Sequence, residues 1–143
     1  MRSRSRRARR SGFTLIEVLL VLVILVILAS LVGFYVQGAQ KRALADAAKT
    51  QIGRLKLCVD AYMVDVRTYP STSQGLNALV SPPSDLPNQT RWRGPYLEGK
   101  NVPLDSWDQP YQYQMIDGGN YRIWSVGPDG SDGTADDISS NNL

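Results

Sequence analysis

The densest group of side chains that could do chemistry is a set of four aspartates near the C-terminus: Asp129, Asp132, Asp136 and Asp137. Glycines at positions 127, 130 and 133 let the backbone turn tightly enough to direct several oxygens at one point. Carboxylates and main-chain carbonyls in a flexible loop suit Ca²⁺ better than a transition metal. The spacing is not that of an EF-hand, and the calcium-binding nonapeptide would need repeats. From these residues alone, a calcium site and a solvated acidic turn both remain open.

The residue types that the sequence lacks exclude most other chemistry. There is no histidine, which removes Ser–His–Asp and Cys–His catalysis and every zinc site that uses histidine. Cys58 is the one cysteine, so neither an internal disulfide nor a cysteine metal cluster can form, and we interpret it as a small buried hydrophobic residue. Because no nucleophile is paired with a base, we expect a protein that is not an enzyme.

Charge and hydropathy divide the N-terminal third of the chain. Residues 1–12 contain six arginines and no acid, whereas the rest of the chain carries a net charge of −3. The basic character therefore belongs to the leader, and we expect no nucleic-acid partner. No formal charge occurs between Glu17 and Lys41. As a helix, this run spans about 35 Å, enough for a bilayer core of about 30 Å, and the basic leader predicts a cytoplasmic N-terminus.

Glu17 is unusual in this apolar setting, because a carboxylate at the bilayer centre costs about 2.5–3.5 kcal/mol and somewhat less near the edge. A cut after Gly12 would create a new α-amino group at Phe13, one helical turn from Glu17. The amine of a neighbouring copy could then neutralise the carboxylate inside a filament. A cleaved secretory signal, a twin-arginine signal and a plain signal anchor are alternatives, but none of them accounts for Glu17.

A long helix is the first element that must position these residues. We expect it from about Phe13 to Val66, with residues 13–36 as the transmembrane and filament-core half and residues 37–66 as an amphipathic half. Pro70 makes a further extension unfavourable. Apolar side chains recur at steps of three and four along one face of the second half: Leu44, Ala48, Ile52, Leu55, Val59, Tyr62, Met63 and Val66.

The second element is a small antiparallel sheet in the loop-rich region 67–143. Residues Tyr111–Ile116 and Tyr121–Val126 alternate in polarity around a four-residue turn, which predicts a hairpin that a further strand flanks. A short helix is expected at Ser73–Val80, with Thr72 or Ser73 as its cap. The fold class is therefore α+β, a long helix packed on a small C-terminal sheet.

Two sets of motifs resemble one known family. Gly12 followed by FTLIEVLLVLVIL resembles the class III signal of type IV pilins and pseudopilins. The blocks TYPSTSQGLNALV and RWRGPYLEGKNVPLDSWDQPYQY, with the glycine- and aspartate-rich tail, are similar to the major pseudopilin of the type II secretion system. The similarity extends from Gly12 to Ile138. Ser106 and Asp108 depart from it, because the family usually has proline and glycine there.

The resemblance implies a structural subunit of the pseudopilus with a pilin-like fold. A prepilin peptidase would remove residues 1–12 and methylate Phe13, and Glu17 would promote subunit docking. The implied partners are other copies in a helical homopolymer, minor pseudopilins, the peptidase, an inner-membrane assembly platform and inner-membrane lipid. The chain would cross the bacterial inner membrane once, with its C-terminal domain in the periplasm. After assembly, the pseudopilus would help to drive folded proteins across the outer membrane.

The resemblance also implies one Ca²⁺ in the acidic loop. Side chains of Asp129, Asp136 and Asp137 and carbonyls near Val126 and Ser131 would bind it, whereas Asp132 would face solvent. A type IV pilin or minor pseudopilin is the nearest alternative, although a type IV major pilin typically has a C-terminal cysteine pair that this chain lacks. An alternative of another class is a membrane-anchored, calcium-dependent binding domain.

Overall fold

The computed structural model describes residues 12–142, with only the backbone described at residues 31–35, 118 and 142. Residues 1–11 of the expected leader lie outside this part. The chain divides into two compact units, Met1–Gln40 and Lys41–Leu143.

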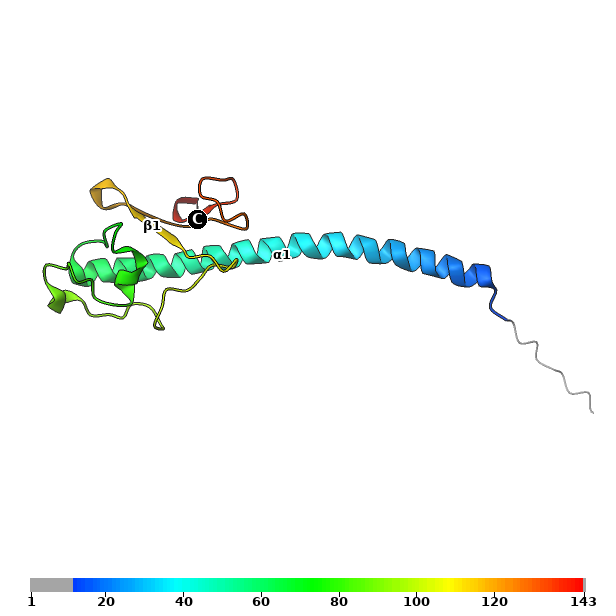
Figure 1. Cartoon of the computed structure of the whole chain (residues 1–143), viewed down its shortest axis with the longest axis horizontal. Coiled ribbons are helices and arrows are strands. Elements are labelled where there is room, and N and C mark those ends of the chain that lie inside the picture. Colours follow the sequence, from blue (N-terminus) through cyan, green and yellow to red (C-terminus); the bar gives the residue numbers. More distant parts are fainter. Residues whose placement is uncertain (1–11, 143) are drawn as a thin grey trace, which may run out of the picture. The chain divides into compact units, whose positions relative to one another are not determined.

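One helix, α1, runs from Leu15 to Val66 (Figure 1), within two residues of the expected start and at the expected end. Thr14 caps it, because the Glu17 N–H lies 3.4 Å from Thr14 Oγ1 and 3.1 Å from the Thr14 carbonyl. At the other end, Arg67 takes a left-handed conformation with φ of 69° and terminates the helix three residues before Pro70.

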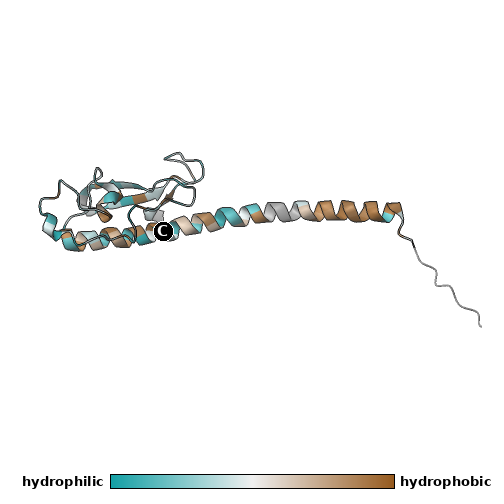
Figure 2. Cartoon of the chain, turned by 60° about the horizontal axis from the view of Figure 1, so that its bottom comes forward, coloured by the Kyte–Doolittle hydropathy of each residue, from teal (hydrophilic) through white to brown (hydrophobic). Residues whose placement is uncertain are grey.

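The first half of α1 is apolar, and the second half is mixed (Figure 2). The large hydrophobic side chains from Phe13 to Leu28 are exposed, several of them by more than half. Among the residues that the structure describes, no helix combines the length and apolarity needed to cross a membrane. The expected span, residues 13–36, includes residues 31–35, whose side chains lie outside the described part.

The sheet has three antiparallel strands in the order β1-β2-β3, which are Gln112–Met115, Tyr121–Ser125 and Ile138–Ser139. Tyr113 pairs with Ile123 in the hairpin, and Trp124 pairs with Ser139 on the other side of β2. The expected hairpin and flanking strand are confirmed. The segment between β2 and β3 is the acidic loop, so both of its ends are fixed by neighbouring strands.

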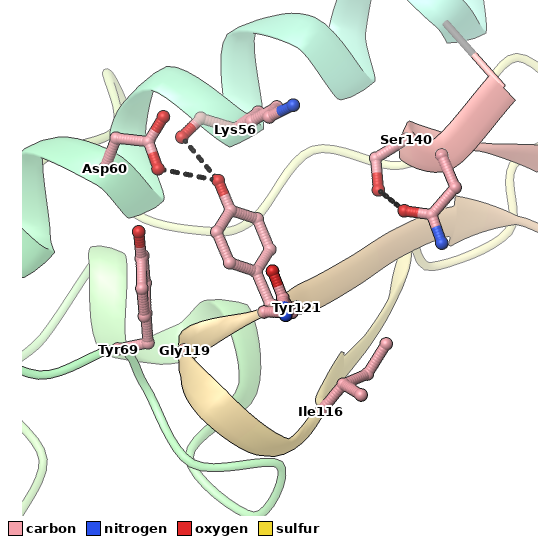
Figure 3. Close-up of a pocket in the computed structure, with 9 residues that line it drawn as sticks. Lys56, Asp60, Tyr69, Ile116, Gly119, Tyr121 and Ser140 are labelled. Atoms are coloured by element: carbon pink, nitrogen blue, oxygen red, sulfur yellow. Dashed lines mark hydrogen bonds between the residues drawn. The ribbon is translucent and has the colours of Figure 1, made fainter.

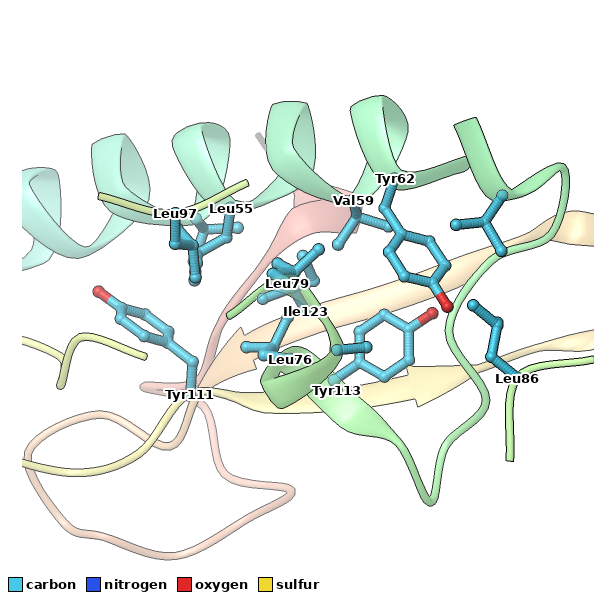
Figure 4. Packing of buried hydrophobic residues seen from close by; sticks show 13 residues of the cluster. Leu55, Val59, Tyr62, Leu76, Leu79, Leu86, Leu97, Tyr111, Tyr113 and Ile123 are labelled. Atoms are coloured by element: carbon cyan, nitrogen blue, oxygen red, sulfur yellow. The ribbon is translucent and has the colours of Figure 1, made fainter. Parts of the chain in front are cut away.

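The core lies between the second half of α1, the sheet and the segment after α1 (Figure 4). Ile52, Leu55, Val59 and Tyr62 are fully buried on one face of the helix, as the three- and four-residue spacing predicts. Met63, expected on this face, is 36% exposed instead. Facing side chains come from the strands and the intervening segment: Leu76, Leu79, Tyr113 and Ile123.

The expected short helix is a 3-10 helix, Gly75–Leu79, and its expected cap is wrong. Ser71 Oγ accepts the Gln74 N–H at 3.2 Å, whereas Thr72 Oγ1 accepts the N–H of Met115 at 3.0 Å. Neither expected residue caps the helix, because Thr72 Oγ1 bonds β1 and Ser73 Oγ lies 2.9 Å from Ser71 Oγ.

Cys58 is half-buried in α1 rather than fully buried. Burial raises the pKa of its thiol, which keeps the reactive thiolate scarce at neutral pH. The interpretation of Cys58 as a packing residue is consistent with this environment.

The turn at residues 105–109 contains both departures from the family pattern. Ser106 Oγ donates a hydrogen bond of 2.8 Å to the Leu44 carbonyl of α1, a contact that proline cannot make. Asp108 adopts a φ of 61°, in the region that favours glycine. The usual glycine of the family therefore fits a backbone requirement of this turn.

We expect Asp108→Gly to raise the free energy of unfolding by about 0.5 kcal/mol. Relief of left-handed strain, of order 1 kcal/mol, should exceed the extra entropy that glycine gives to the unfolded chain. Chemical denaturation of both proteins measures the difference. Asp117→Gly is the matched control, because Asp117 is an exposed turn aspartate outside the left-handed region, and there glycine should destabilise. Equal effects of the two substitutions would contradict the backbone explanation.

Candidate functional site

The expected processing junction lies immediately before the long helix. Gly12 and Phe13 are non-helical and exposed, and the Phe13 side chain is 76% accessible. Among the described residues, apart from Gly12 and its chain neighbours, no atom lies within 4 Å of a Cβ built on Gly12. Because the cap at Thr14 starts α1 beyond this bond, the Gly12–Phe13 peptide is accessible without unwinding the helix.

Glu17 is exposed in the first turn of α1, among exposed apolar side chains such as Ile16 and Val18. A carboxylate is favourable at this position, since the helix N-terminus carries partial positive charge. Within residues 12–142, Glu17 forms no ion pair. Glu17 is thus the one charged side chain among the described residues of the apolar segment.

In the acidic loop, short-range hydrogen bonds hold each of the three expected carboxylate ligands. Asp129 Oδ1 accepts the Ser131 N–H at 2.9 Å, and Asp137 Oδ2 accepts the Gly133 N–H at 2.9 Å. Thr134 Oγ1 donates to Asp136 Oδ1 at 2.7 Å and holds the pKa of that carboxyl below its usual value. The Asp136 side chain is thereby held in its carboxylate form, which is the form that a metal ligand needs.

The two ends of the acidic loop touch at Gly127. Its φ is +71°, and a Cβ placed there would lie 2.6 Å from the Asp136 carbonyl oxygen. No other residue type can occupy this position without moving the loop. The chain next to the expected carbonyl ligand Val126 is thereby brought against Asp136. The Ser131 carbonyl, the other expected main-chain ligand, lies 3.3 Å from Thr134 Oγ1.

Two further side chains, Arg122 and Trp124 of β2, also hold the loop. Trp124 Nε1 donates to Asp132 Oδ1 at 2.8 Å, so Asp132 is exposed as expected but is bonded to the sheet. Arg122 lies 3.9 Å from Asp137 Oδ2, and its guanidinium sits 4.4 Å from the centre of the Trp124 ring. The alternation of β2 predicts which face they share, but not their partners in the loop.

The donor set of the loop fits a hard cation, although the carboxylates do not form a compact cluster. Among the described residues, no group of three or more acidic, histidine or cysteine side chains is close enough to hold a metal ion. Asp137 Oδ1 is buried and has no hydrogen-bond partner there. A buried carboxylate oxygen without a partner costs free energy that a cation could recover. Convergence of Asp129, Asp136 and Asp137 would thus require movement of the loop.

A cavity of about 410 Å³ lies where α1 meets the start of β2 (Figure 3). The Tyr121 hydroxyl closes one side of it and donates to Asp60 Oδ1 at 2.8 Å. Burial, followed by this hydrogen bond to a carboxylate, raises the pKa of Tyr121, so the phenol stays protonated. The hydrogen bond between Tyr121 and Asp60 therefore connects the sheet with the helix.

Comparison with known proteins agrees with this architecture. The family model "Type II secretion system (T2SS), protein G" matches residues 35–141, and the "Prokaryotic N-terminal methylation motif" matches residues 7–33. Type II secretion system core protein G of Aeromonas hydrophila is 43% identical over 139 residues, which is 94% of either chain. The same protein of Pseudomonas aeruginosa is 42% identical over 133 residues, 91% of this chain and 92% of its own.

A solved structure is also similar. The crystal structure of the major pseudopilin from the type 2 secretion system of enterohaemorrhagic Escherichia coli aligns with a TM-score of 0.65 at 33% identity. The alignment covers 75% of this chain and 94% of that one. These matches are to core protein G rather than to type IV pilins or minor pseudopilins. The chain therefore belongs to the protein G family of type II secretion systems, the major pseudopilins, and is a structural subunit of the pseudopilus.

Proposed function

We propose that the chain is made as a precursor that a prepilin peptidase cuts between Gly12 and Phe13 and methylates on Phe13. The match of residues 7–33 to a methylation motif supports this proposal. The accessible junction ahead of the Thr14 cap supports it as well. The arginine-rich leader would hold the uncut N-terminus on the cytoplasmic side of the inner membrane. Residues beyond about 40 would then be periplasmic.

We infer that Glu17 then drives subunit entry into the filament. The observation that carries this step is a single carboxylate in the first turn of a helix whose large apolar side chains are exposed. Packing against other copies would cover those side chains, and the Phe13 amine of a neighbour would neutralise Glu17. An inner-membrane platform would add subunits, minor pseudopilins would join the same filament, and its growth would push folded proteins across the outer membrane.

Mature protein from cells that contain the peptidase should begin at Phe13 and carry a methylated amine. The physical reason is that the bond to be cut lies in exposed, non-helical chain. Intact-mass measurement should show that residues 1–12 are lost and that the mass of one methyl group is gained. Gly12→Leu is the test variant, because it places a bulky side chain next to the bond to be cut and changes nothing else. The peptidase should leave this precursor uncut. Recovery of uncut chain alone from the unsubstituted protein would refute the proposal.

We further propose that the acidic loop binds one Ca²⁺. Asp129, Asp136 and Asp137 would supply carboxylate oxygens, and Val126 and Ser131 would supply carbonyls. The buried, unpartnered Asp137 Oδ1 and the contact of Gly127 with Asp136 support this donor set. The ion would neutralise the converging carboxylates and stabilise the folded loop by mass action.

A further inference from the structure

Asp105 is a buried carboxylate whose two oxygens are both used. Its side chain is only 7% exposed, yet it lies 24 residues before the acidic loop begins to turn at Asp129. Oδ1 accepts the N–H groups of Trp107 at 2.9 Å and Gln109 at 2.8 Å, which shapes the turn at residues 105–109. Oδ2 accepts the hydroxyl proton of Ser125. The carboxylate therefore connects this turn with the last residue of β2.

Ser125 passes this connection on to the acidic loop. It is fully buried, and its Oγ accepts the Gly127 N–H at 3.1 Å. A serine hydroxyl has one proton, and Ser125 uses it in the hydrogen bond to Asp105. The lone pairs of Ser125 Oγ therefore remain free to accept the Gly127 N–H. Because the amide of Gly127 is fixed in this way, its left-handed backbone is fixed at the point of contact with Asp136.

We propose that Asp105 and Ser125 are positioning residues of the cation site, holding the loop closed at Gly127 before an ion arrives. This inference rests on the proposed calcium binding. Neither residue would touch the ion, but together they fix the Val126–Gly127 end against Asp136. The turn is itself attached to α1, because Ser106 Oγ donates to the Leu44 carbonyl. Hydrogen bonds through the turn at residues 105–109 thus connect one end of the acidic loop to the long helix.

The substitution Asp105→Asn tests the direction of the hydrogen bonds at nearly constant shape. The asparagine NH₂ group, in the place of Oδ2, would donate to Ser125 Oγ. The serine proton would then lose its acceptor and point toward the Gly127 N–H, which weakens the hydrogen bond from that N–H. Ser125→Ala removes the acceptor of Gly127 directly. Ser140→Ala is the matched control, because Ser140 is also buried and its Oγ accepts the Ile123 N–H from the same strand.

The experiment uses the full chain in detergent micelles and two measurements. Calcium titration calorimetry should show that Ser125→Ala and Asp105→Asn weaken Ca²⁺ binding about tenfold, the lower end for supporting partners of metal ligands. Amide exchange with chelator present should show faster exchange at Gly127 in both variants. Ser140→Ala should change neither quantity. A positioning role predicts faster exchange at Gly127 alone. A general loss of stability would instead speed exchange along the whole of β2.

The outcomes separate the two proposals. Unchanged affinity and unchanged exchange at Gly127 in Ser125→Ala would overturn the positioning role. If the unsubstituted chain binds no Ca²⁺, the proposed metal site fails, and exchange at Gly127 in chelator alone decides whether Asp105 and Ser125 close the loop. If Asp105→Asn does not fold by circular dichroism, the smaller change Ser125→Ala gives the decision.

Discussion

Replacing Glu17 by alanine should abolish pseudopilus assembly while the part of the chain from Lys41 onward keeps its fold. Glu17 is exposed in the first turn of α1 and takes no part in the hydrophobic core, which lies in the second half of the helix. Removing one partner of a buried ion pair costs about 3–5 kcal/mol, because the other charge stays buried without compensation. In a filament, this means about a hundredfold or greater loss of affinity at each contact.

Electron microscopy of filaments from cells that overproduce the chain checks this expectation, with membrane fractionation to show that insertion is intact. Asp46→Ala is the control, since Asp46 is an exposed acid of the same helix outside the apolar segment. It should assemble normally. Filaments of ordinary number and length from Glu17→Ala would show that the carboxylate is not needed for docking.

Calcium should raise the thermal stability of the protein, and Asp129→Ala should remove most of that gain. At free Ca²⁺ about 100 times the dissociation constant, binding stabilises the folded state by about 2.7 kcal/mol. For a unit of this size, the melting temperature should rise by about 10 °C. Magnesium should substitute poorly, because a loop rich in carbonyls seldom meets its octahedral geometry.

Two neighbouring aspartates make the calcium test specific. Asp132→Ala should lower the melting temperature in chelator as well as in calcium, since it loses the hydrogen bond from Trp124. Asp129→Ala should change the melting temperature in chelator little, because weaker repulsion among the remaining carboxylates offsets the lost hydrogen bond from the Ser131 N–H. Differential scanning calorimetry of the unsubstituted chain and both variants, each in calcium and in chelator, measures these melting temperatures. Equal melting temperatures of the unsubstituted protein in calcium and in chelator would show that the loop is a solvated acidic turn and not a calcium site.

The helix and the hairpin could be predicted because each is specified by a local pattern. The steps of three and four from Ile52 to Tyr62 place one face of α1 in the core, and the two apolar runs around a turn give the hairpin. The register was not given by this pattern: the expected four-residue turn would put Ile116 opposite Tyr121, but Met115 pairs with Tyr121. The cap of Gly75–Leu79 could not be predicted in the same way. It depends on Thr72 bonding a strand more than 40 residues later, which no local pattern indicates.

The candidate site likewise has a part that local sequence specifies and a part that depends on contacts between distant segments. Gly12, Phe13 and Glu17 are neighbours in the sequence, so their relation to one helix end follows from the chain itself. The connection from Asp105 through Ser125 to Gly127 joins segments 20 residues apart, and none of the three side chains has a distinctive spacing. Only the packing of the turn at residues 105–109 against the end of β2 brings them together.

Arg122 gives the acidic loop a resident counter-ion. Stacking on Trp124 and a hydrogen bond of 3.1 Å from its Nε to Ser139 Oγ hold the guanidinium near Asp137 without any metal. Departure of a bound cation would therefore leave one carboxylate partly neutralised instead of exposing a bare acidic cluster. If the loop binds Ca²⁺ as proposed, the contact between Arg122 and Asp137 would keep part of the site charge-balanced when the ion is absent.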